Sequence, residues 1–495
     1  MMYGEEKSDS LIVAANLANN PQGAESVERR SGAKGNAEQP HMRRTQSRES
    51  MSQRLSRVRE AAKQRKKERF TALFHLLTVE ALEAAFLSLS RKAAAGVDGV
   101  RWKDYAENLK VNIADLHRRL HQGSYRAQPG RRHYIPKADG KQRPLGIASL
   151  EDKIVQYALV KILNAVYEND FMGFSYGFRP GRSQHDALDA LATGLVRTNV
   201  NWVLDADISQ FFDKVSHEWL IRFIEHRIGD QRVIRLIRKW LTAGTSEEGE
   251  WRASEEGTPQ GAVISPLLAN IYLHYVFDLW AHQWRRRHAT GNVVMVRYAD
   301  DIVIGFDKRI DAQCFRIAMQ RRLKEFGLTV HPKKTRLTEF GRFAAENRAS
   351  RGKGKPETFN FLGFTHISGK DRSGRFMLIR KTRRDRMTAT LKAIKDGLRK
   401  RWHYSIPEQG KWLRRVVQGY LNYHSVPGNY PMMRKFRIYV TDLWRRALRR
   451  RSQQDDTTWT KANRLAAVWL PKVRVLHPWP VERFTARHPR QEPGA

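Results

Sequence analysis

Cysteine is almost missing from this sequence, since Cys314 is the only one in 495 residues. A single thiol excludes an internal disulfide and a zinc site built from several thiolates, and it favours a reducing compartment. No apolar run reaches the ~18 residues of a spanning helix, so we expect no membrane partner. The start of the chain resembles neither a secretory signal nor an Arg-rich transit peptide. We therefore expect a cytoplasmic protein, and the excess of Arg over Lys points to a bacterial source.

Acidic residues are also few relative to basic ones. The chain has 90 Lys+Arg against 51 Asp+Glu, a formal net charge of +39. Such a field attracts polyanions, and nucleic acid is the first candidate. Composition alone leaves a ribosome-like basic protein without enzyme activity equally open. An apolar fraction of 41% is enough for real cores, and the length suggests roughly two or three domains.

The chain divides into segments of different character. A polar leader covers residues 1–52, and a basic stretch from Arg54 to Arg69 predicts a helix lying along phosphates. Thr78 is expected to cap the next helix. Strand-like and helix-like runs then alternate between about 130 and 365, which indicates an α/β core. Residues 371–452 hold 23 Lys+Arg against 5 Asp+Glu among aromatics, as basic RNA-binding helices would, and a Pro-rich tail is predicted to be extended.

Paired acids inside an apolar run are the most informative feature. Asp300 and Asp301 interrupt the strand-like stretch Val293–Phe306, where unpaired carboxylates are costly. A divalent cation would compensate, since hard oxygen ligands suit Mg²⁺. A second acidic strand carries Asp205 and Asp207, which should share one face, so spacing does not choose between them. Carboxylates from two strands can hold the paired ions used in phosphoryl displacement; a plain Asp-Asp turn is the alternative.

Seven sequence blocks, in order, resemble the reverse transcriptases encoded by group II introns. The blocks are Ile135-Pro136-Lys137 with Arg143 to Ile147, Tyr176 to Ser183, Asp207 to Asp213, Gly257 to Ala262 with Ser265 to Asn270, Tyr298-Ala299-Asp300-Asp301, Gly327 to Thr335, and Phe361 to Phe364. The match runs from about 54 to 452. An Asp pair alone would be weak evidence for this family, but seven blocks in the same order are specific evidence.

The resemblance implies a right-hand polymerase, with fingers and palm in an α+β reverse transcriptase core and an α-helical thumb. The implied domains are a disordered leader (1–52), a basic helical extension with the start of the fingers (53–130), fingers and palm (131–370), a thumb or maturase domain (371–455) and a Pro-rich basic tail (456–495). Many relatives end in an endonuclease with paired cysteines, which this sequence is expected to lack.

The resemblance also implies site residues. It places the catalytic carboxylates at Asp207, Asp300 and Asp301. The same positions with Ile208 would bind two Mg²⁺ ions, for which Mn²⁺ is expected to substitute. The nucleotide-binding residues would be Lys137 and Arg143 on the triphosphate, Gln260 against the incoming nucleotide, Phe212 as a sugar gate that favours dNTPs, and Lys333 or Lys334 at the pyrophosphate. For each lysine the alternative role is a solvated surface charge, and for Phe212 the alternative role is packing in the core.

The expected partners are group II intron RNA, an RNA template with a DNA primer, dNTPs and a DNA target. RNA contacts are predicted at Lys63, Arg65, Lys66, Lys67, Arg179, Arg182, Arg383, Arg384, Arg414, Arg415, Arg445 and Arg446. The sequence thus predicts an RNA-dependent DNA polymerase that also assists intron splicing and mobility. A catalytically silent splicing factor, or a reverse transcriptase recruited to repair or phage defence, remains the alternative.

Overall fold

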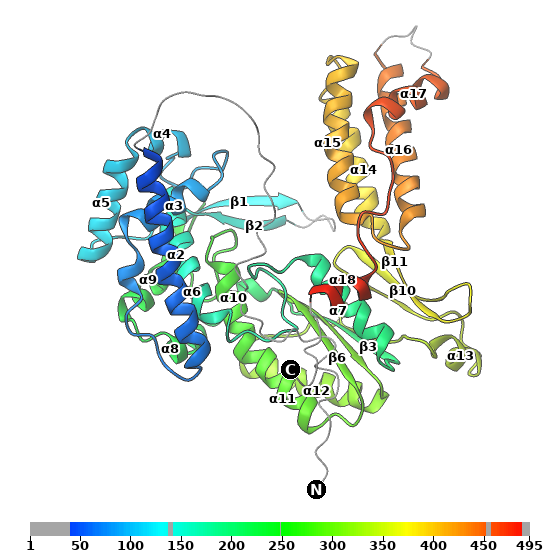
Figure 1. The fold of residues 1–495 in the computed structure, drawn as a ribbon, viewed down its shortest axis with the longest axis horizontal. Coiled ribbons are helices and arrows are strands. Elements are labelled where there is room, and N and C mark those ends of the chain that lie inside the picture. The colour runs from blue at the N-terminus through cyan, green and yellow to red at the C-terminus, as the bar shows by residue number, and fades with distance from the viewer. Residues whose placement is uncertain (1–39, 137–141, 248, 452–456, 488–495) are drawn as a thin grey trace.

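The computed structural model describes residues 40–136, 142–247, 249–451 and 457–487, whose arrangement is drawn in Figure 1. Helices and strands alternate up to residue 382, and helices follow in the described part beyond it. This order confirms the predicted α/β core with a helical region after it. None of the described helices has both the length and the apolar character needed to cross a bilayer.

A group of helices precedes the first strand: α2 (Pro40–Gln64), the short η1 (Phe74–Leu76), α3 (Val79–Ser88), α4 (Trp102–Glu107) and α5 (Leu109–Gln122). Thr78 caps α3 as predicted, because its hydroxyl accepts a hydrogen bond from the Ala81 amide at 3.2 Å. The predicted leader 1–52 is wrong for its last part, since α2 already begins at Pro40. Residues 1–39 lie outside the described part.

The basic stretch is helical only in part. Because α2 ends at Gln64, the cations Arg65, Lys66 and Lys67 follow the helix instead of lying on it. Just after the helix end, the buried guanidinium of Arg227 donates to the carbonyls of Arg65 and Glu68 at 3.0 and 2.6 Å. The Glu68 amide also donates to the Arg65 carbonyl at 3.2 Å, so a tight turn follows α2.

A four-stranded central sheet lies in the middle of the molecule (Figure 1). Its antiparallel strands, in the order β6-β7-β3-β8, are β3 (Trp202–Asp207), β6 (Val293–Tyr298), β7 (Asp301–Phe306) and β8 (Arg336–Glu339). Side chains alternate between its faces, so that Leu204 and Ile304 join one core while Val203 and Val303 join another. The run Val293–Phe306 is therefore two strands joined by a tight turn at its acidic pair.

Helices cover both faces of the central sheet. Helix α12 packs on β3 and β7, and α7 packs on β6 from the opposite side. The helices of this part are α6 (Leu150–Tyr167), α7 (Gln184–Arg197), the short η2 (Phe211–Asp213), α8 (His217–Arg227), α9 (Gln231–Thr242), α10 (Ser265–Leu273), the π-helical turn η3 (His274–Asp278), α11 (Leu279–Arg287) and α12 (Arg309–Glu325).

Two smaller sheets flank this centre. One has the order β2-β1-β4-β5 and consists of β1 (Gly130–Pro136), β2 (Gln142–Ile147), β4 (Thr245–Glu247) and β5 (Glu250–Arg252). The other, β11-β10-β9, consists of β9 (Thr358–Phe361), β10 (Phe364–Lys370) and β11 (Phe376–Thr382), and follows the small helix α13 (Ala344–Ala349). The sequence predicts two strands, from Arg132 to Pro136 and from Arg143 to Ile147, joined by a turn at 138–140. The strands are β1 and β2, which pair antiparallel, and the turn lies outside the described residues.

The helical region projects from the β11-β10-β9 sheet (Figure 1), and its Tyr423 donates a hydroxyl to the Leu362 carbonyl at 2.7 Å. Its helices are α14 (Arg384–Arg399), α15 (Ile406–His424), α16 (Tyr430–Arg449) and α17 (Trp459–Trp469). They share a core of their own, in which Trp444 is 1% exposed and donates its indole N–H to Gln409 Oε1 at 2.9 Å. A bundle with a separate apolar core leaves its many cations on the outside.

The predicted extended tail after residue 456 is wrong. Helix α17 packs on α15 and α16, and the chain then runs back to the centre, where α18 (Pro480–Arg487) lies against α7 (Figure 1). Phe484 is buried there, and the guanidinium of Arg483 pairs with Asp189 of α7. The prolines at 471 and 478 do lie in a stretch without helix, residues 471–479, but α17 and α18 on either side of it bury Ala462, Ala466 and Phe484.

Candidate active site

Three aspartates meet at one end of the central sheet. The register of β3 and β7 sets Asp207 directly opposite Asp301, and Asp300 occupies the turn from β6 to β7. Ala299 begins this turn with φ of 56°, a left-handed conformation that residues other than glycine adopt at a cost. The turn thus aims two neighbouring carboxyl groups at the end of β3, and the structure brings together the three predicted catalytic residues.

Negative charge is concentrated at this end. Burial, followed by the charges of Asp300 and Asp207, raises the pKa of Asp301 to about 6. Burial, followed by Asp301 and Asp207, raises the pKa of Asp205 to about 7. Asp205 therefore belongs to the same electrostatic group as Asp207, as the strand spacing predicted. Carboxylates that disfavour each other's ionisation are the setting in which a bound cation is most stabilising.

A lysine supplies such a cation. Lys334 Nζ lies 2.9 Å from Asp207 Oδ2, whereas Lys333 is an exposed neighbour. In the part of the chain that the structure describes, no three His, Cys, Asp or Glu side chains converge as a closed metal shell. The carboxyl cluster with an ammonium group already on one member nevertheless fits a divalent cation, because hard oxygen donors and excess negative charge are what Mg²⁺ requires.

The predicted nucleotide residues Phe212 and Gln260 lie next to one another. Phe212 is on η2 just after β3, and its carbonyl accepts from Thr258 N at 2.7 Å. Gln260 donates its side-chain amide to Asp213 Oδ1 at 2.6 Å. Gly257 packs so closely on this segment that a Cβ atom would come within 2.9 Å of the Phe212 carbonyl oxygen. The loop is therefore fixed against the end of β3.

Strand β2 is joined to the same loop. Gly146 N donates to the carbonyl of Gln260 at 2.6 Å, which links the β1–β2 hairpin to the site. The backbone of Arg143 pairs with Ile135 in this hairpin, and Lys137 lies outside the described residues. Ile208, the fourth predicted metal position, is buried and bridges to Val330, the segment that leads to Lys334.

One predicted RNA contact is wrong. Arg179 is 5% exposed, forms an ion pair with Glu168 at 2.9 Å and donates to the Ser175 carbonyl. Arg182 is half-buried and donates to the Gly173 carbonyl at 2.5 Å, and burial lowers the pKa of its guanidinium to about 10. Both arginines hold the loop that precedes α7, and an RNA contact of Arg182 stays a prediction.

The other predicted RNA contacts are on the outside or at its edge. In the N-terminal part Lys63, Arg65, Lys66 and Lys67 are all exposed. In the helical region, Arg384, Arg414, Arg415 and Arg446 are exposed, and Arg383 and Arg445 are half-buried. Some of them have local partners, such as Asp442, whose carboxylate pairs with Arg445 at 2.9 Å. These positions are compatible with phosphate contact, which stays a prediction.

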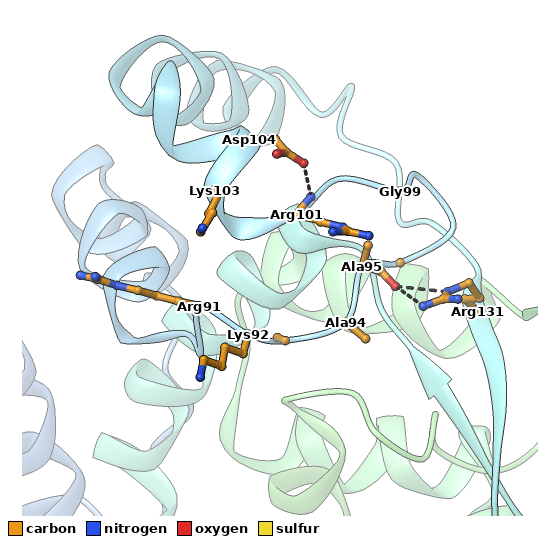
Figure 2. A pocket seen from close by; sticks show the side chains of 11 residues that line it. Arg91, Lys92, Ala94, Ala95, Gly99, Arg101, Lys103, Asp104 and Arg131 are labelled. Atoms are coloured by element: carbon orange, nitrogen blue, oxygen red, sulfur yellow. Dashed lines mark hydrogen bonds between the residues drawn. The ribbon is translucent and has the colours of Figure 1, made fainter. Parts of the chain in front are cut away.

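The sequence did not predict a basic hollow that lies near the β2-β1-β4-β5 sheet. It has a volume of about 770 Å³, and Figure 2 shows charged side chains around it. The charged lining residues are Arg91, Lys92, Arg101, Lys103, Asp104 and Arg131. Arg131 donates to the Ala95 carbonyl at 2.9 Å, which fixes the loop that forms one wall. The sequence signal for this hollow was the group of cations on both sides of residues 95–99, with Arg91 and Lys92 before them and Arg101 and Lys103 after them.

A buried ion pair behind the acidic turn was also missed. Arg297 and Asp278 are both fully buried, and their side chains are joined at 2.5 Å. The sequence signal was a charged residue in the middle of the apolar run of β6, and an aspartate among apolar neighbours in η3.

Comparisons with known proteins agree with this geometry. Residues 135–366 match the family described as reverse transcriptase (RNA-dependent DNA polymerase). The chain is 44% identical over 206 residues to protein YkfC of Escherichia coli (strain K12), a match covering 41% of this chain and 54% of that protein. It is 37% identical over 223 residues to the group II intron-encoded protein LtrA of Lactococcus lactis subsp. cremoris, covering 44% and 37%.

A third relative is matched over a longer stretch. The putative COX1/OXI3 intron 1 protein of Saccharomyces cerevisiae is 26% identical over 393 residues, covering 66% of this chain and 46% of that protein. The chain thus spans about half, or less, of the length of these relatives. The family match includes the whole central sheet with its three aspartates, and reverse transcriptases work with divalent metal ions. Residues 135–366 are therefore similar to reverse transcriptases, and the chain is similar to proteins that introns encode.

Proposed function

We propose that this protein is an RNA-dependent DNA polymerase that copies group II intron RNA into DNA. The observation that carries the proposal is the β3–β7 register, which sets Asp207 opposite Asp301 and beside Asp300. When bound, two Mg²⁺ ions would activate the primer 3′-hydroxyl and stabilise the leaving pyrophosphate, and Mn²⁺ would substitute. Asp207, Asp300 and Asp301 would hold them, with Ile208 contributing through its backbone carbonyl, as its side chain has no donor atom.

The neighbouring residues would bind the nucleotide. Phe212, fixed by the loop from Gly257 to Gln260, would exclude a 2′-hydroxyl and so favour dNTPs, while Gln260 would lie along the incoming nucleotide. Lys334 would exchange its contact with Asp207 for the pyrophosphate oxygens. Arg143 and Lys137 would meet the triphosphate from the β1–β2 hairpin, where a guanidinium can bind two oxygens at once.

We further propose that the protein binds its parent intron RNA and assists splicing and mobility. The support is the number of exposed cations on the helical region and along the basic hollow, together with relatives whose names refer to introns. In the proposed division of the chain into domains, residues 53–130 and 371–455 bind RNA, and residues 131–370 contain the polymerase active site. During intron mobility, a DNA target would be the molecule into which the intron is inserted.

The test is primer extension on an RNA template by the purified full chain with Mg²⁺ and dNTPs. The variant Asp300→Ala/Asp301→Ala should lower extension at least about a thousandfold, as loss of a catalytic unit does. The control Asp371→Ala/Asp396→Ala removes the same charge from outside the central sheet and should extend like the native protein. Extension by neither native nor control protein, with tight RNA binding retained, would favour the splicing factor without polymerase activity.

A further inference from the structure

Arg297 lies directly behind the acidic turn and is completely buried. Its guanidinium binds both carboxylate oxygens of Asp278, at 2.7 and 2.5 Å. The remaining donors reach Asn270 Oδ1 at 3.1 Å, Ser175 Oγ at 2.7 Å and the carbonyl of Ala299 at 3.0 Å. One side chain therefore joins two separate segments, the loop at Ser175 and the continuous helical stretch of α10 and η3, to the backbone of the turn.

These segments also touch the turn from the other side. Asn270 donates its amide to the Gly177 carbonyl at 2.7 Å. Gly177 packs against the turn so tightly that a Cβ atom would lie 2.3 Å from Ala299 N. The left-handed backbone of Ala299 persists only where surrounding contacts impose it, since such a conformation is otherwise unfavourable. Arg297 and Gly177 supply those contacts from opposite sides.

Stability alone does not explain this arrangement. A buried ion pair is often no more stabilising than well-packed apolar side chains of the same volume. What an apolar pair cannot supply is a donor for the Ala299 carbonyl. A lysine could not replace the arginine either, because a single ammonium group cannot reach acceptors spread around a planar fork. The geometry of the turn is thus the property that requires Arg297.

We propose that Arg297 is a positioning residue for the metal site: it fixes the Ala299 carbonyl and so the direction in which Asp300 and Asp301 present their carboxylates to a divalent cation. This inference rests on the proposed polymerase site. Arg297 contacts neither nucleotide nor metal, and it acts through the backbone of the turn.

The experiment compares Arg297→Lys with Arg227→Lys in the full chain. Arg227 is a matched control, since its side chain is 2% exposed, pairs with Asp170 at 2.7 Å and binds backbone carbonyls, but it is the last residue of α8 and contacts the chain just after α2. Mn²⁺ binding is titrated by electron paramagnetic resonance, and the Asp300→Ala/Asp301→Ala protein gives the binding that occurs elsewhere. Primer extension is measured in parallel across Mg²⁺ concentrations, and thermal unfolding reports on folding.

Arg297→Lys should weaken Mn²⁺ binding about tenfold, as loss of an outer-shell partner does, and should raise the Mg²⁺ midpoint of extension similarly. Arg227→Lys should lower the unfolding temperature but leave Mn²⁺ binding within about twofold of native, because its contacts are remote from the outer shell. Native-like Mn²⁺ binding by Arg297→Lys, equal weakening by Arg227→Lys, or no native binding above the double-alanine level would overturn the inference.

Two results separate this inference from the proposed function. If Arg297→Lys weakens Mn²⁺ binding while the native protein extends no primer, the polymerase proposal fails and the positioning role stands. If Arg297→Lys does not unfold cooperatively, Ser175→Ala replaces it, because this variant removes one acceptor and leaves the ion pair intact. Ser175→Ala should weaken Mn²⁺ binding by a smaller factor, and native-like binding would count against the role.

Discussion

Arginine serves opposite purposes in two regions of this molecule. Around the central sheet, Arg179, Arg227 and Arg297 are buried, and each is paired with a carboxylate and with backbone carbonyls. In residues 371–452, 23 cations face 5 acidic residues, and most arginines of those helices are exposed. The net charge of +39 therefore includes two groups of arginines, buried and exposed, that have different roles. Buried arginines fix backbone geometry, and exposed ones create the field that polyanions meet.

The largest expected effect comes from breaking a buried pair. Arg227→Met leaves the Asp170 carboxylate without its partner, which typically costs about 3–5 kcal/mol. Arg415→Met on exposed α15 should change stability by no more than ~0.5 kcal/mol. Urea unfolding followed by tryptophan fluorescence measures both variants. Equal shifts of the two midpoints would refute the division into structural and field-forming arginines.

A smaller change in stability is expected from a substitution of Asp301, whose carboxyl group lies near other carboxyl groups. The pKa of Asp301 is raised to about 6, whereas an unfolded aspartate titrates near ~3.9. Between these values the folded protein binds more protons than the unfolded chain, so this group lowers stability as pH rises. In EDTA, Asp301→Asn should therefore be more stable than native at pH 8, by roughly 1 kcal/mol after allowance for solvent screening.

The gain from Asp301→Asn should disappear near pH 4, where the native carboxyl is protonated in the folded state. Unfolding in urea at several pH values measures it, and Asp396→Asn, at an exposed position of α14, is the control. A gain that grows toward low pH would contradict the assigned direction of the pKa shift.

The smallest effect on stability is expected for a variant that instead changes RNA binding. Arg384→Met/Arg415→Met should leave unfolding unchanged within ~0.5 kcal/mol. It should reduce the slope of log Kd against log salt by up to about 2, roughly one for each lost phosphate contact. Fluorescence anisotropy with labelled RNA at several KCl concentrations measures the slope. Arg179→Lys, which is buried, should leave that slope unchanged, and a reduced slope would return Arg179 to the RNA interface.

Local patterns predicted much of the fold. Thr78 was identified as a cap because the hydroxyl and its amide partner are three residues apart. The strands holding Asp207 and Asp301 were visible as apolar β-branched runs, and ordered motifs gave the fold class. These features depend on neighbours in sequence, which a single sequence contains.

Errors arose where the local pattern does not show the deciding partner. Arg179 was assigned to RNA because a cation in a motif does not reveal an acceptor such as Glu168. Arg297 was overlooked because its partners come from two other segments, the loop at Ser175 and the continuous helical stretch of α10 and η3. The tail was predicted to be extended since the surface that orders α18 belongs to α7, 294 residues away at the Arg483–Asp189 pair.

The return of α18 to α7 has a consequence for how the protein is made. A ribosome adds roughly 5–20 residues per second, so about 15–60 seconds pass between synthesis of Asp189 and of Arg483, which are 294 residues apart. Throughout that interval the outer side of α7 lacks the cover that Phe484 later provides. A nascent chain that has not yet reached α18 therefore exposes an apolar surface to chaperones and proteases, and docking of α18 removes that exposure.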